Sequence, residues 1–379
     1  MRRSAVAGAT ALGLGIAACG TSVQSRTGPA SAGRPATAGH APAAQVTAAQ
    51  VTAAQVTAAR AAAARATGHA TAARATTAGA TTGHATPAHV SRHGPPYPVG
   101  ELNLTFIDRS RTIRFPGRAR GPRTLVTVVR YPAVGRVGAG SDVDERGAAL
   151  DRADGPFPLV VFGHGFRVTP AAYYRLLRAW ARAGYVVAAP VFPLENAHAP
   201  GGPDESDLVN QPADMSDVIS GMLAARGPLA GAVDPREIAV SGQSDGGETA
   251  LAVAYDRHFL DPRVRAAIIL SGARIPGPRT MWFPRGAPAL LATQGTADTT
   301  NRPSLTYAFF RLAHAPKYLL KLTGAGHLLP YTDQQPQLGV VERVSTDFLD
   351  RYLKDERPAV SEITRDGDRP GTAVLAAHP

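Results

Sequence analysis

A serine flanked by glycines is the residue of this chain best placed to do covalent chemistry. The stretch Gly-Gln-Ser-Asp-Gly at residues 242–246 fits the pattern G-x-S-x-G. An apolar run at 237–241 precedes it, and an Ala-rich stretch at 246–254 follows it. A serine on a tight turn between a strand and a helix presents its hydroxyl at the helix N-terminus, where the helix dipole stabilises developing negative charge. The spacing therefore predicts that Ser244 is a nucleophile.

A serine hydroxyl needs a general base before it becomes a good nucleophile, and in proteins that base is most often histidine. Three histidines follow Ser244 before residue 355, namely His258, His314 and His327. His327 ends the Gly-rich sequence Gly-Ala-Gly-His after an apolar run, so it is expected in a loop at the end of a strand. His258 is expected on the surface and His314 at the end of a helix. We therefore predict that His327 is the base, with a structural loop histidine as the alternative.

The base in turn needs a carboxylate that fixes its tautomer. Asp298 follows the apolar run at 289–293 through a short polar turn, and it lies between Ser244 and His327 in the chain. Serine, acid and histidine follow one another in that order when the serine stands on a strand–turn–helix elbow. Asp298 is therefore the predicted acid, with a turn-forming aspartate as the alternative. Asp333 competes for this role but comes after His327.

Two backbone N–H groups are needed to stabilise the oxyanion that forms when a serine attacks a carbonyl. We expect one from Asp245, directly after the nucleophile, and one from Phe166 in the sequence Gly-His-Gly-Phe. The Phe166 ring and Trp282 are also candidates for contact with substrate, and packing is the alternative role for Trp282. His164 is expected to brace the same loop by hydrogen bonds, because one catalytic histidine suffices.

The elements that must position these residues alternate along the chain. Strands are predicted at 102–113, 124–131, 158–162, 185–191, 237–241, 266–270, 289–293 and 318–322. Helices are predicted at 170–183, 213–225, 246–254, 305–313 and 339–353. This alternation predicts an α/β fold with a mostly parallel central sheet, helices on both faces, and chemical residues at the carboxyl ends of the strands. Because no long apolar insertion separates the strands, no large lid domain is expected.

Four motifs in this order are similar to those of one superfamily. They are Gly-His-Gly-Phe at 163–166, the elbow around Ser244, Gly-Thr-Ala-Asp at 295–298 and Gly-Ala-Gly-His at 324–327. The set resembles the α/β-hydrolases. Within that superfamily it resembles the group that holds dienelactone-hydrolase-like esterases, chlorophyllases, platelet-activating-factor acetylhydrolases and cutinase-like polyester hydrolases. The resemblance covers residues 97–355, which we expect to form the α/β-hydrolase catalytic domain.

The chain also departs from these relatives. Gln243 and Asp245 stand where relatives often have His and Met or Phe. The C-terminal disulfide common in polyester hydrolases cannot form, because Cys19 is the one cysteine of the chain. Dienelactone hydrolases proper use a cysteine nucleophile, whereas this chain has Ser244. These differences affect the subgroup and leave the superfamily resemblance intact.

The resemblance implies a serine hydrolase that cleaves carboxylic esters through an acyl-enzyme and needs neither a cofactor nor a metal. An open cleft favours short or medium acyl esters, with polyesters as a further substrate class. Two other functions stay open on the sequence alone. One is a peptidase or amidase on the same fold, and the other is a non-catalytic envelope lipoprotein that keeps the fold as a binding module.

The N-terminal residues resemble a bacterial export signal. Arg2 and Arg3 precede a short apolar run, and the sequence Ile-Ala-Ala-Cys that ends at Cys19 resembles a lipobox. We therefore expect residues 1–18 to be a lipoprotein signal peptide and Cys19 to be acylated. The expected location is the extracytoplasmic side of the cell membrane, with secretion as the alternative.

Residues 19–96 are rich in Ala and Thr, and residues 1–96 contain no Asp, Glu, Lys, Phe or Trp. Such a segment buries too little apolar surface to offset its ordering entropy, so a disordered linker is expected at 19–96. The formal net charge is +11, and the eight arginines of residues 1–96 leave +3 for residues 97–379. Basic charge is therefore not concentrated on a folded face, and no nucleic-acid partner is expected. We expect a monomer with a flexible C-terminal tail at 356–379.

Overall fold

The computed structural model of the chain describes residues 94–135, 144–275, 283–354 and 359–379. The expected signal peptide, Cys19, nearly all of the expected linker and Trp282 lie outside the described residues. The described part is built on a ten-stranded sheet in the order β10-β9-β8-β7-β6-β4-β5-β2-β1-β3. Its strands are β1 (Val99–Ile113), β2 (Gly121–Pro132), β3 (Glu145–Arg146), β4 (Phe157–Gly163), β5 (Val186–Pro190), β6 (Val233–Gln243), β7 (Val264–Leu270), β8 (Ala289–Gly295), β9 (Lys317–Leu322) and β10 (Ala373–His378).

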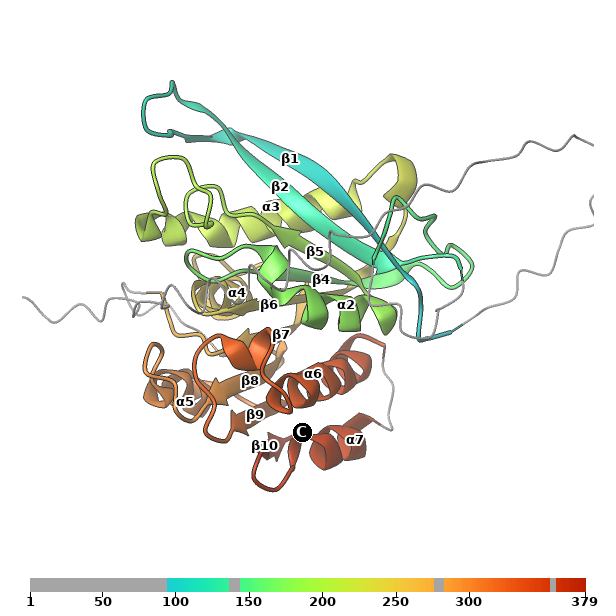
Figure 1. Cartoon of the computed structure of the whole chain (residues 1–379), viewed down its shortest axis with the longest axis vertical. Helices are drawn as coiled ribbons and strands as arrows, with labels where there is room; N and C mark the ends of the chain where they lie inside the picture. The colour runs from blue at the N-terminus through green and yellow to red at the C-terminus, as the bar shows by residue number, and fades with distance from the viewer. Residues whose placement is uncertain (1–93, 136–143, 276–282, 355–358) are drawn as a thin grey trace, which may run out of the picture. The chain divides into compact units, whose positions relative to one another are not determined.

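The middle of the sheet is parallel and its two sides are antiparallel. Strands β5, β4, β6, β7, β8 and β9 run parallel to their neighbours, so their carboxyl ends meet at one edge. Strand β2 pairs antiparallel with β5, and β1 folds back on β2 as a long hairpin (Figure 1). The predicted mostly parallel central sheet is confirmed.

Helices cover both faces of the sheet, as the sequence predicts. They are α2 (Tyr174–Arg182), α3 (Gln211–Leu223), α4 (Asp245–Tyr255), α5 (Pro303–Leu312), α6 (Gln337–Leu353) and α7 (Ala359–Gly367). Side chains of β4 alternate between two cores, because successive residues of a strand point to opposite faces. Leu159 and Val161 pack in the core that holds α3, α4 and α5, whereas Val160 and Phe162 pack in the core that holds α2, α6 and α7.

The apolar stripe of α2 shows how the sequence fixes this packing. Leu176, Leu177 and Trp180 recur at helical spacing and are fully buried. The Trp180 indole Nε1–H donates to the Ser345 hydroxyl on α6 at 2.8 Å, so the buried ring keeps a hydrogen-bond partner. Gly184 follows α2 with φ of 97°, a left-handed conformation that glycine adopts without steric cost.

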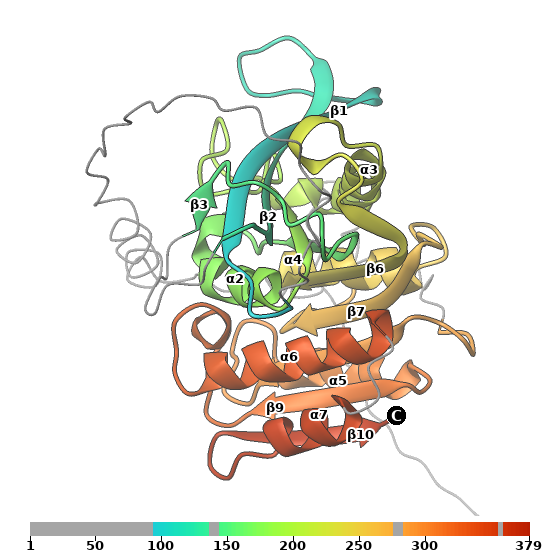
Figure 2. The same ribbon diagram turned by 90° about the vertical axis from the view of Figure 1, so that its right-hand side faces the viewer.

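The C-terminal residues differ from the sequence-based expectation. The described residues 359–379 do not form a flexible tail, because they contain α7 and β10. Strand β10 pairs antiparallel with β9 and extends the sheet, while α7 packs beside α6 (Figure 2). Ile363 and Leu375 are buried in the same core as α6. The folded region therefore continues past the predicted boundary at residue 355.

No helix among the residues that the structure describes is both long and apolar enough to cross a bilayer.

The folded C-terminal segment makes a prediction about stability. Ile363 on α7 is 0% exposed, whereas Val374 on β10 is 49% exposed. Ile363→Ala should lower the free energy of unfolding by about 2–5 kcal/mol, because it leaves a cavity in the core. The matched control Val374→Ala should change it by less than about 0.5 kcal/mol. Urea unfolding followed by circular dichroism measures both, and equal small effects would contradict the packing of α7.

Candidate active site

Ser244 stands on a strained turn between β6 and α4. Strand β6 ends at Gln243 and α4 begins at Asp245, so Ser244 alone forms the connection. Its φ of 55° and ψ of −123° lie in a region that non-glycine residues rarely occupy. Two glycines make the turn possible. A Cβ at Gly242 would lie 2.1 Å from the Gly246 carbonyl oxygen, and a Cβ at Gly246 would lie 2.1 Å from that of Gly163. The backbone contact between strand and helix therefore requires glycine at both positions.

The structure brings Ser244, His327 and Asp298 together from three different loops. The Ser244 Oγ lies 2.8 Å from His327 Nε2, and His327 Nδ1 lies 2.8 Å from Asp298 Oδ2. Asp298 follows β8 and His327 follows β9, so both side chains come from the carboxyl edge of the parallel strands. A carboxylate beside Nδ1 keeps the proton on that nitrogen, which leaves Nε2 free to accept the serine proton. The three residues predicted from the sequence thus have the geometry of a serine relay.

Asp298 is held in place by four hydrogen bonds. Its Oδ1 accepts the backbone N–H groups of Thr300 at 2.9 Å and Asn301 at 3.0 Å. Its Oδ2 accepts from His327 and also from Gln294 Nε2 at 3.1 Å. Hydrogen bonds at both oxygens leave the carboxyl group little freedom to rotate. The carboxylate is therefore fixed in orientation before any substrate arrives.

The other candidate residues lie away from Ser244. Asp333 pairs with Arg175 at 3.9 Å rather than with His327. His258 is exposed and packs edge-on against Phe259, and His314 is exposed after α5. These positions agree with the surface roles expected from the sequence.

His164 braces the loop that follows β4, as expected. Its Nδ1–H donates to the Gly165 carbonyl at 2.8 Å, and its Nε2 accepts the Phe192 N–H at 3.0 Å. Complete burial lowers the pKa of His164 to about 4, so the imidazole is neutral. The ring therefore ties the loop after β4 to the loop after β5.

Of the two expected oxyanion-hole donors, Asp245 directly follows Ser244 in the chain and Phe166 lies in the loop after β4. The Asp245 N–H is in the first turn of α4, where N–H groups have no partner within the helix. The Phe166 N–H has no protein acceptor among the described residues. Gly165, next to Phe166, passes so close to the elbow that a Cβ there would lie 3.2 Å from Ser244 Cβ. The half-buried Phe166 ring lies 5.9 Å from the Arg167 guanidinium.

A group of buried acids behind the elbow is a feature that sequence reasoning missed. Glu195, Asp245 and Glu248 are all buried, and both carboxyl oxygens of Glu195 lack a hydrogen-bond partner in the described part of the chain. Burial raises the pKa of each of these carboxyls, and repulsion by Asp245 adds to the effect at Glu195 and Glu248. Residue spacing around Ser244 does not indicate this group of acids, because Glu195 comes from the loop after β5. No group of three or more metal-ligating side chains is arranged for a metal within the described residues.

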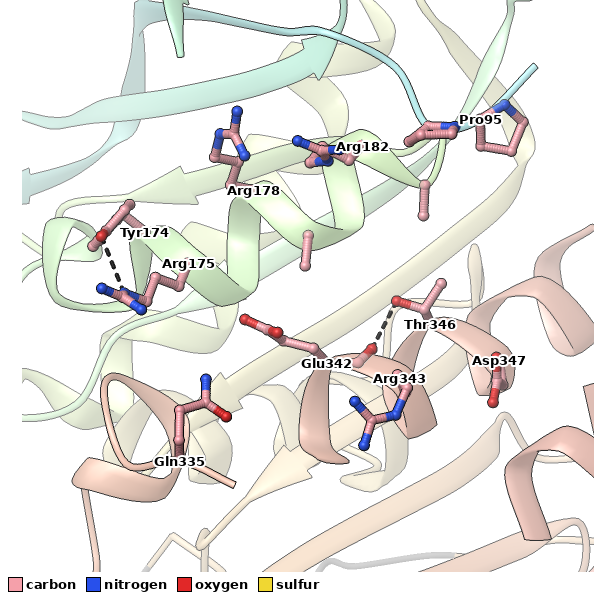
Figure 3. A pocket seen from close by; sticks show the side chains of 13 residues that line it. Pro95, Tyr174, Arg175, Arg178, Arg182, Gln335, Glu342, Arg343, Thr346 and Asp347 are labelled. Atoms are coloured by element: carbon pink, nitrogen blue, oxygen red, sulfur yellow. Dashed lines mark hydrogen bonds between the residues drawn. The ribbon is translucent and has the colours of Figure 1, made fainter. Parts of the chain in front are cut away.

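A hollow of about 760 Å³ lies between α2 and α6, away from the serine (Figure 3). Arg175, Arg178 and Arg182 line it from α2, and Glu342 lines it from α6. In Figure 3 the Arg175 and Glu342 side chains point into the space between the two helices. None of Ser244, Asp298 and His327 lines this hollow, so it is separate from the candidate active site.

Comparisons with known proteins agree with this fold. A sequence model of the chlorophyllase family matches residues 149–270, which include Phe166 and Ser244 but not Asp298 or His327. Chlorophyllase-2 of Arabidopsis thaliana is 23% identical over 198 residues, covering 46% of this chain and 61% of the relative. The match thus spans about three fifths of the relative's length. A solved structure, a ferulic acid esterase from Streptomyces cinnamoneus, has a TM-score of 0.52 and 23% identity, covering 75% of this chain and 95% of that one.

The chain has the α/β-hydrolase fold. The parallel strand order, the elbow at the end of β6 and the structural match all define this class. The chlorophyllase match falls within the group of relatives that the sequence motifs resemble. The superfamily resemblance is therefore confirmed.

The buried acids predict an unusual dependence of stability on pH. Because the folded-state pKa of Glu195 is raised above its ordinary value of 4.5, the folded protein keeps a proton that the unfolded chain releases. Folding then binds protons, and the free energy of unfolding falls as pH rises above about 4.5, by at most about 1.4 kcal/mol per pH unit for one such group. Glu195→Gln removes this loss. The variant should therefore gain more in Tm over wild type at about pH 8 than at about pH 5.

The control for this experiment is Glu145→Gln, which alters an exposed glutamate on β3. It should change Tm by the same small amount at both pH values. Thermal unfolding of the three proteins at the two pH values makes the comparison. A Glu195→Gln variant whose Tm difference from wild type does not grow with pH would show that Glu195 is ionised in the folded protein.

Proposed function

We propose that this protein is a serine hydrolase that cleaves carboxylic esters. The observation that carries the proposal is the relay of 2.8 Å contacts from Ser244 Oγ through the His327 ring to Asp298, with Ser244 at the elbow between β6 and α4. Ser, base and acid in this arrangement are suited to acyl transfer. The structural relative is a ferulic acid esterase, which supports an ester as the substrate class.

In the first half-reaction, Ser244 Oγ attacks the ester carbonyl carbon while His327 Nε2 accepts the hydroxyl proton. The carbonyl oxygen becomes an oxyanion, which the N–H groups of Phe166 and Asp245 stabilise. Collapse of this intermediate breaks the carbonyl–alkoxide bond. His327 returns its proton to the departing alkoxide, and the acyl group stays on Ser244 as an ester.

In the second half-reaction, water takes the place of the alcohol. His327 accepts a proton from the water, whose oxygen attacks the acyl carbon bound to Ser244. The second oxyanion uses the same two N–H donors, and its collapse releases the carboxylic acid. The proton then returns from His327 to Ser244 Oγ, so the enzyme is regenerated without a redox partner.

The proposed substrates are short and medium acyl esters, with polyesters as a further class. The site itself acts on any accessible ester, so the shape of the cleft must set the preference. Between β5 and α3 the described chain holds the short 3-10 helix Glu205–Asn210, and the described parts of the connection after β7 hold no helix. Phe166 is half-buried in the loop after β4 and is the proposed apolar contact for the substrate.

For location, we propose a lipid anchor at Cys19 that holds the catalytic domain on the extracytoplasmic side of the membrane. The support is the sequence Ile-Ala-Ala-Cys after a short apolar run with two preceding arginines. A diacylglycerol and an N-acyl chain together would exceed the two signals that stable anchoring needs.

The triad assignment predicts a severe loss of turnover in single variants. Ser244→Ala and His327→Ala should each lower kcat about 10⁴–10⁶-fold, and the double variant should be little worse, because the residues act as one unit. The measurement is hydrolysis of p-nitrophenyl esters from short to long acyl chains, with turnover expected to be best for the shorter chains. A fluorophosphonate should label Ser244 in wild type and fail to label Ser244→Ala.

A matched control is Ser304→Ala, which changes an exposed serine at the start of α5. It should keep wild-type kcat and labelling. Ester hydrolysis that survives Ser244→Ala would overturn the assignment. A wild-type protein that neither hydrolyses esters nor reacts with the probe would favour the non-catalytic binding module.

The proposed anchor predicts how the full chain partitions. Wild-type protein expressed in a bacterial host should enter the detergent phase of a Triton X-114 separation, because two or more acyl chains bind detergent strongly. Cys19→Ala should move the protein to the aqueous phase or leave an uncleaved precursor. Mass spectrometry of the N-terminal peptide checks for the acyl chains, and equal partitioning of wild type and variant would contradict the anchor.

A further inference from the structure

A chain of buried hydrogen bonds joins the loop that carries Phe166 to the loop that carries His327. It starts at the Gly165 N–H, which donates to the Tyr173 hydroxyl at 3.2 Å. That hydroxyl donates to Gln243 Oε1 at 2.7 Å. Gln243 Nε2 then donates to the His327 backbone carbonyl at 3.0 Å. Neither Tyr173 nor Gln243 is part of the triad, and the sequence pattern assigned neither a role.

The directions of these bonds are consistent with one another. A backbone N–H can only donate, so the Tyr173 oxygen accepts from Gly165 and its proton is left for Gln243 Oε1. Burial raises the pKa of Tyr173, so the hydroxyl keeps this proton. The Gln243 amide nitrogen then faces the carbonyl of His327, which is the acceptor it needs. The network thus fixes the orientation of the Gln243 side chain.

The Gln243 amide also lies against the ring of the base. Its Nε2 is 3.3 Å from His327 Nε2, the same nitrogen that lies 2.8 Å from Ser244 Oγ. An amide N–H at this place can donate to the neutral imidazole but cannot accept from the protonated one. The amide therefore favours the neutral base, and after proton transfer it leaves the imidazolium N–H to face Ser244 and the leaving group.

The position leaves little freedom for the side chain. Gln243 and Tyr173 are both buried, and the Tyr173 ring packs on Phe162 of β4 with centroids 4.9 Å apart. A Cβ at Gly165 would lie 2.8 Å from Gln243 Oε1, so the loop after β4 rests on the glutamine. A displacement of about 1 Å in such a site can cost about 100-fold in rate.

We propose that Gln243 is a positioning residue that sets His327 and, through Tyr173, the loop carrying the Phe166 oxyanion donor in one geometry around Ser244. The proposal rests on the proposed function, since it concerns the base and the oxyanion loop of that reaction. Gln243 touches neither the substrate nor the bond that breaks. It acts by holding the base and the oxyanion loop at fixed places while charge develops between them.

The test uses Gln243→Met, Tyr173→Phe and the double variant. Gln243→Met keeps a similar side-chain length and removes the three hydrogen-bond contacts of the Gln243 amide. Gln243→Met should lower kcat about 10–100-fold with KM changed less than about threefold, because ground-state binding does not use the amide. Tyr173→Phe should lower kcat about 3–10-fold, since the hydrogen bond from Gln243 Nε2 to the His327 carbonyl remains. The double variant should lie within about threefold of Gln243→Met, because the two residues act in one network.

The pH profile separates positioning from simple loss of packing. Without the amide N–H, the neutral form of His327 loses a donor, so the acidic limb of kcat/KM in Gln243→Met should move to higher pH by about half a unit to one unit. Tyr173→Phe should leave that limb in place. The matched control is Tyr255→Phe on α4, a buried tyrosine whose hydroxyl donates to the Pro288 carbonyl at 2.9 Å. Its kcat should stay within about twofold of wild type.

The rate of fluorophosphonate labelling at Ser244 is measured for every variant, because this reaction needs the nucleophile, the base and the oxyanion hole but no particular ester. If Gln243→Met does not fold by thermal unfolding, Gln243→Glu replaces it, since the carboxyl keeps the acceptor for Tyr173 and removes the amide donor. If the folded Gln243 and Tyr173 variants keep the kcat and labelling rates of wild type, the positioning role is overturned and the proposed function still stands. A wild type that labels but cleaves no ester would overturn the proposed function, and the labelling rates would still decide the role of Gln243.

Discussion

The close contact of β4, β6 and α4 at three glycines is the constraint on which the site depends. Because the Gly163, Gly242 and Gly246 backbones touch, α4 can begin one residue after β6 ends. That geometry forces Ser244 to a φ of 55° and places its side chain at the carboxyl edge of the parallel strands. The loops after β4, β8 and β9, which carry Phe166, Asp298 and His327, reach the same edge because the strands between them are parallel. The strain at one serine is maintained by the packing of the whole sheet.

The carboxyl groups around the site lie in two opposite environments. Asp298 receives four hydrogen bonds, so its negative charge is stabilised where it must orient His327. Glu248 lies four residues after the same serine, and Glu195 comes from the loop after β5. Both are buried with no cation against them among the described side chains, and their raised pKa favours the neutral form.

Periodicity and turn signals predicted the central elements well. The predicted strands at 237–241 and 289–293 lie within β6 and β8, and the predicted helix at 339–353 lies within α6. Strand β10 and helix α7 were missed for a physical reason. Strand β10 is a short edge strand rich in Ala, whose stability comes from pairing with β9 and not from its own apolar pattern. Tertiary contact therefore decided the structure of a segment that the sequence alone describes as a tail.

By itself, the sequence determined which residues form the relay. The glycine spacing around Ser244 is a local pattern, and the order of Asp298 and His327 is a property of the chain, so both can be read from the sequence itself. Only the tertiary structure decided what surrounds these residues. Gln243 contacts His327, which is 84 residues away in the sequence, and Tyr173, which is 70 residues away. Glu195 reaches the elbow from a loop about fifty residues earlier in the chain. Such contacts arise when parallel strands bring distant loops to one edge, and no short window of sequence contains both partners.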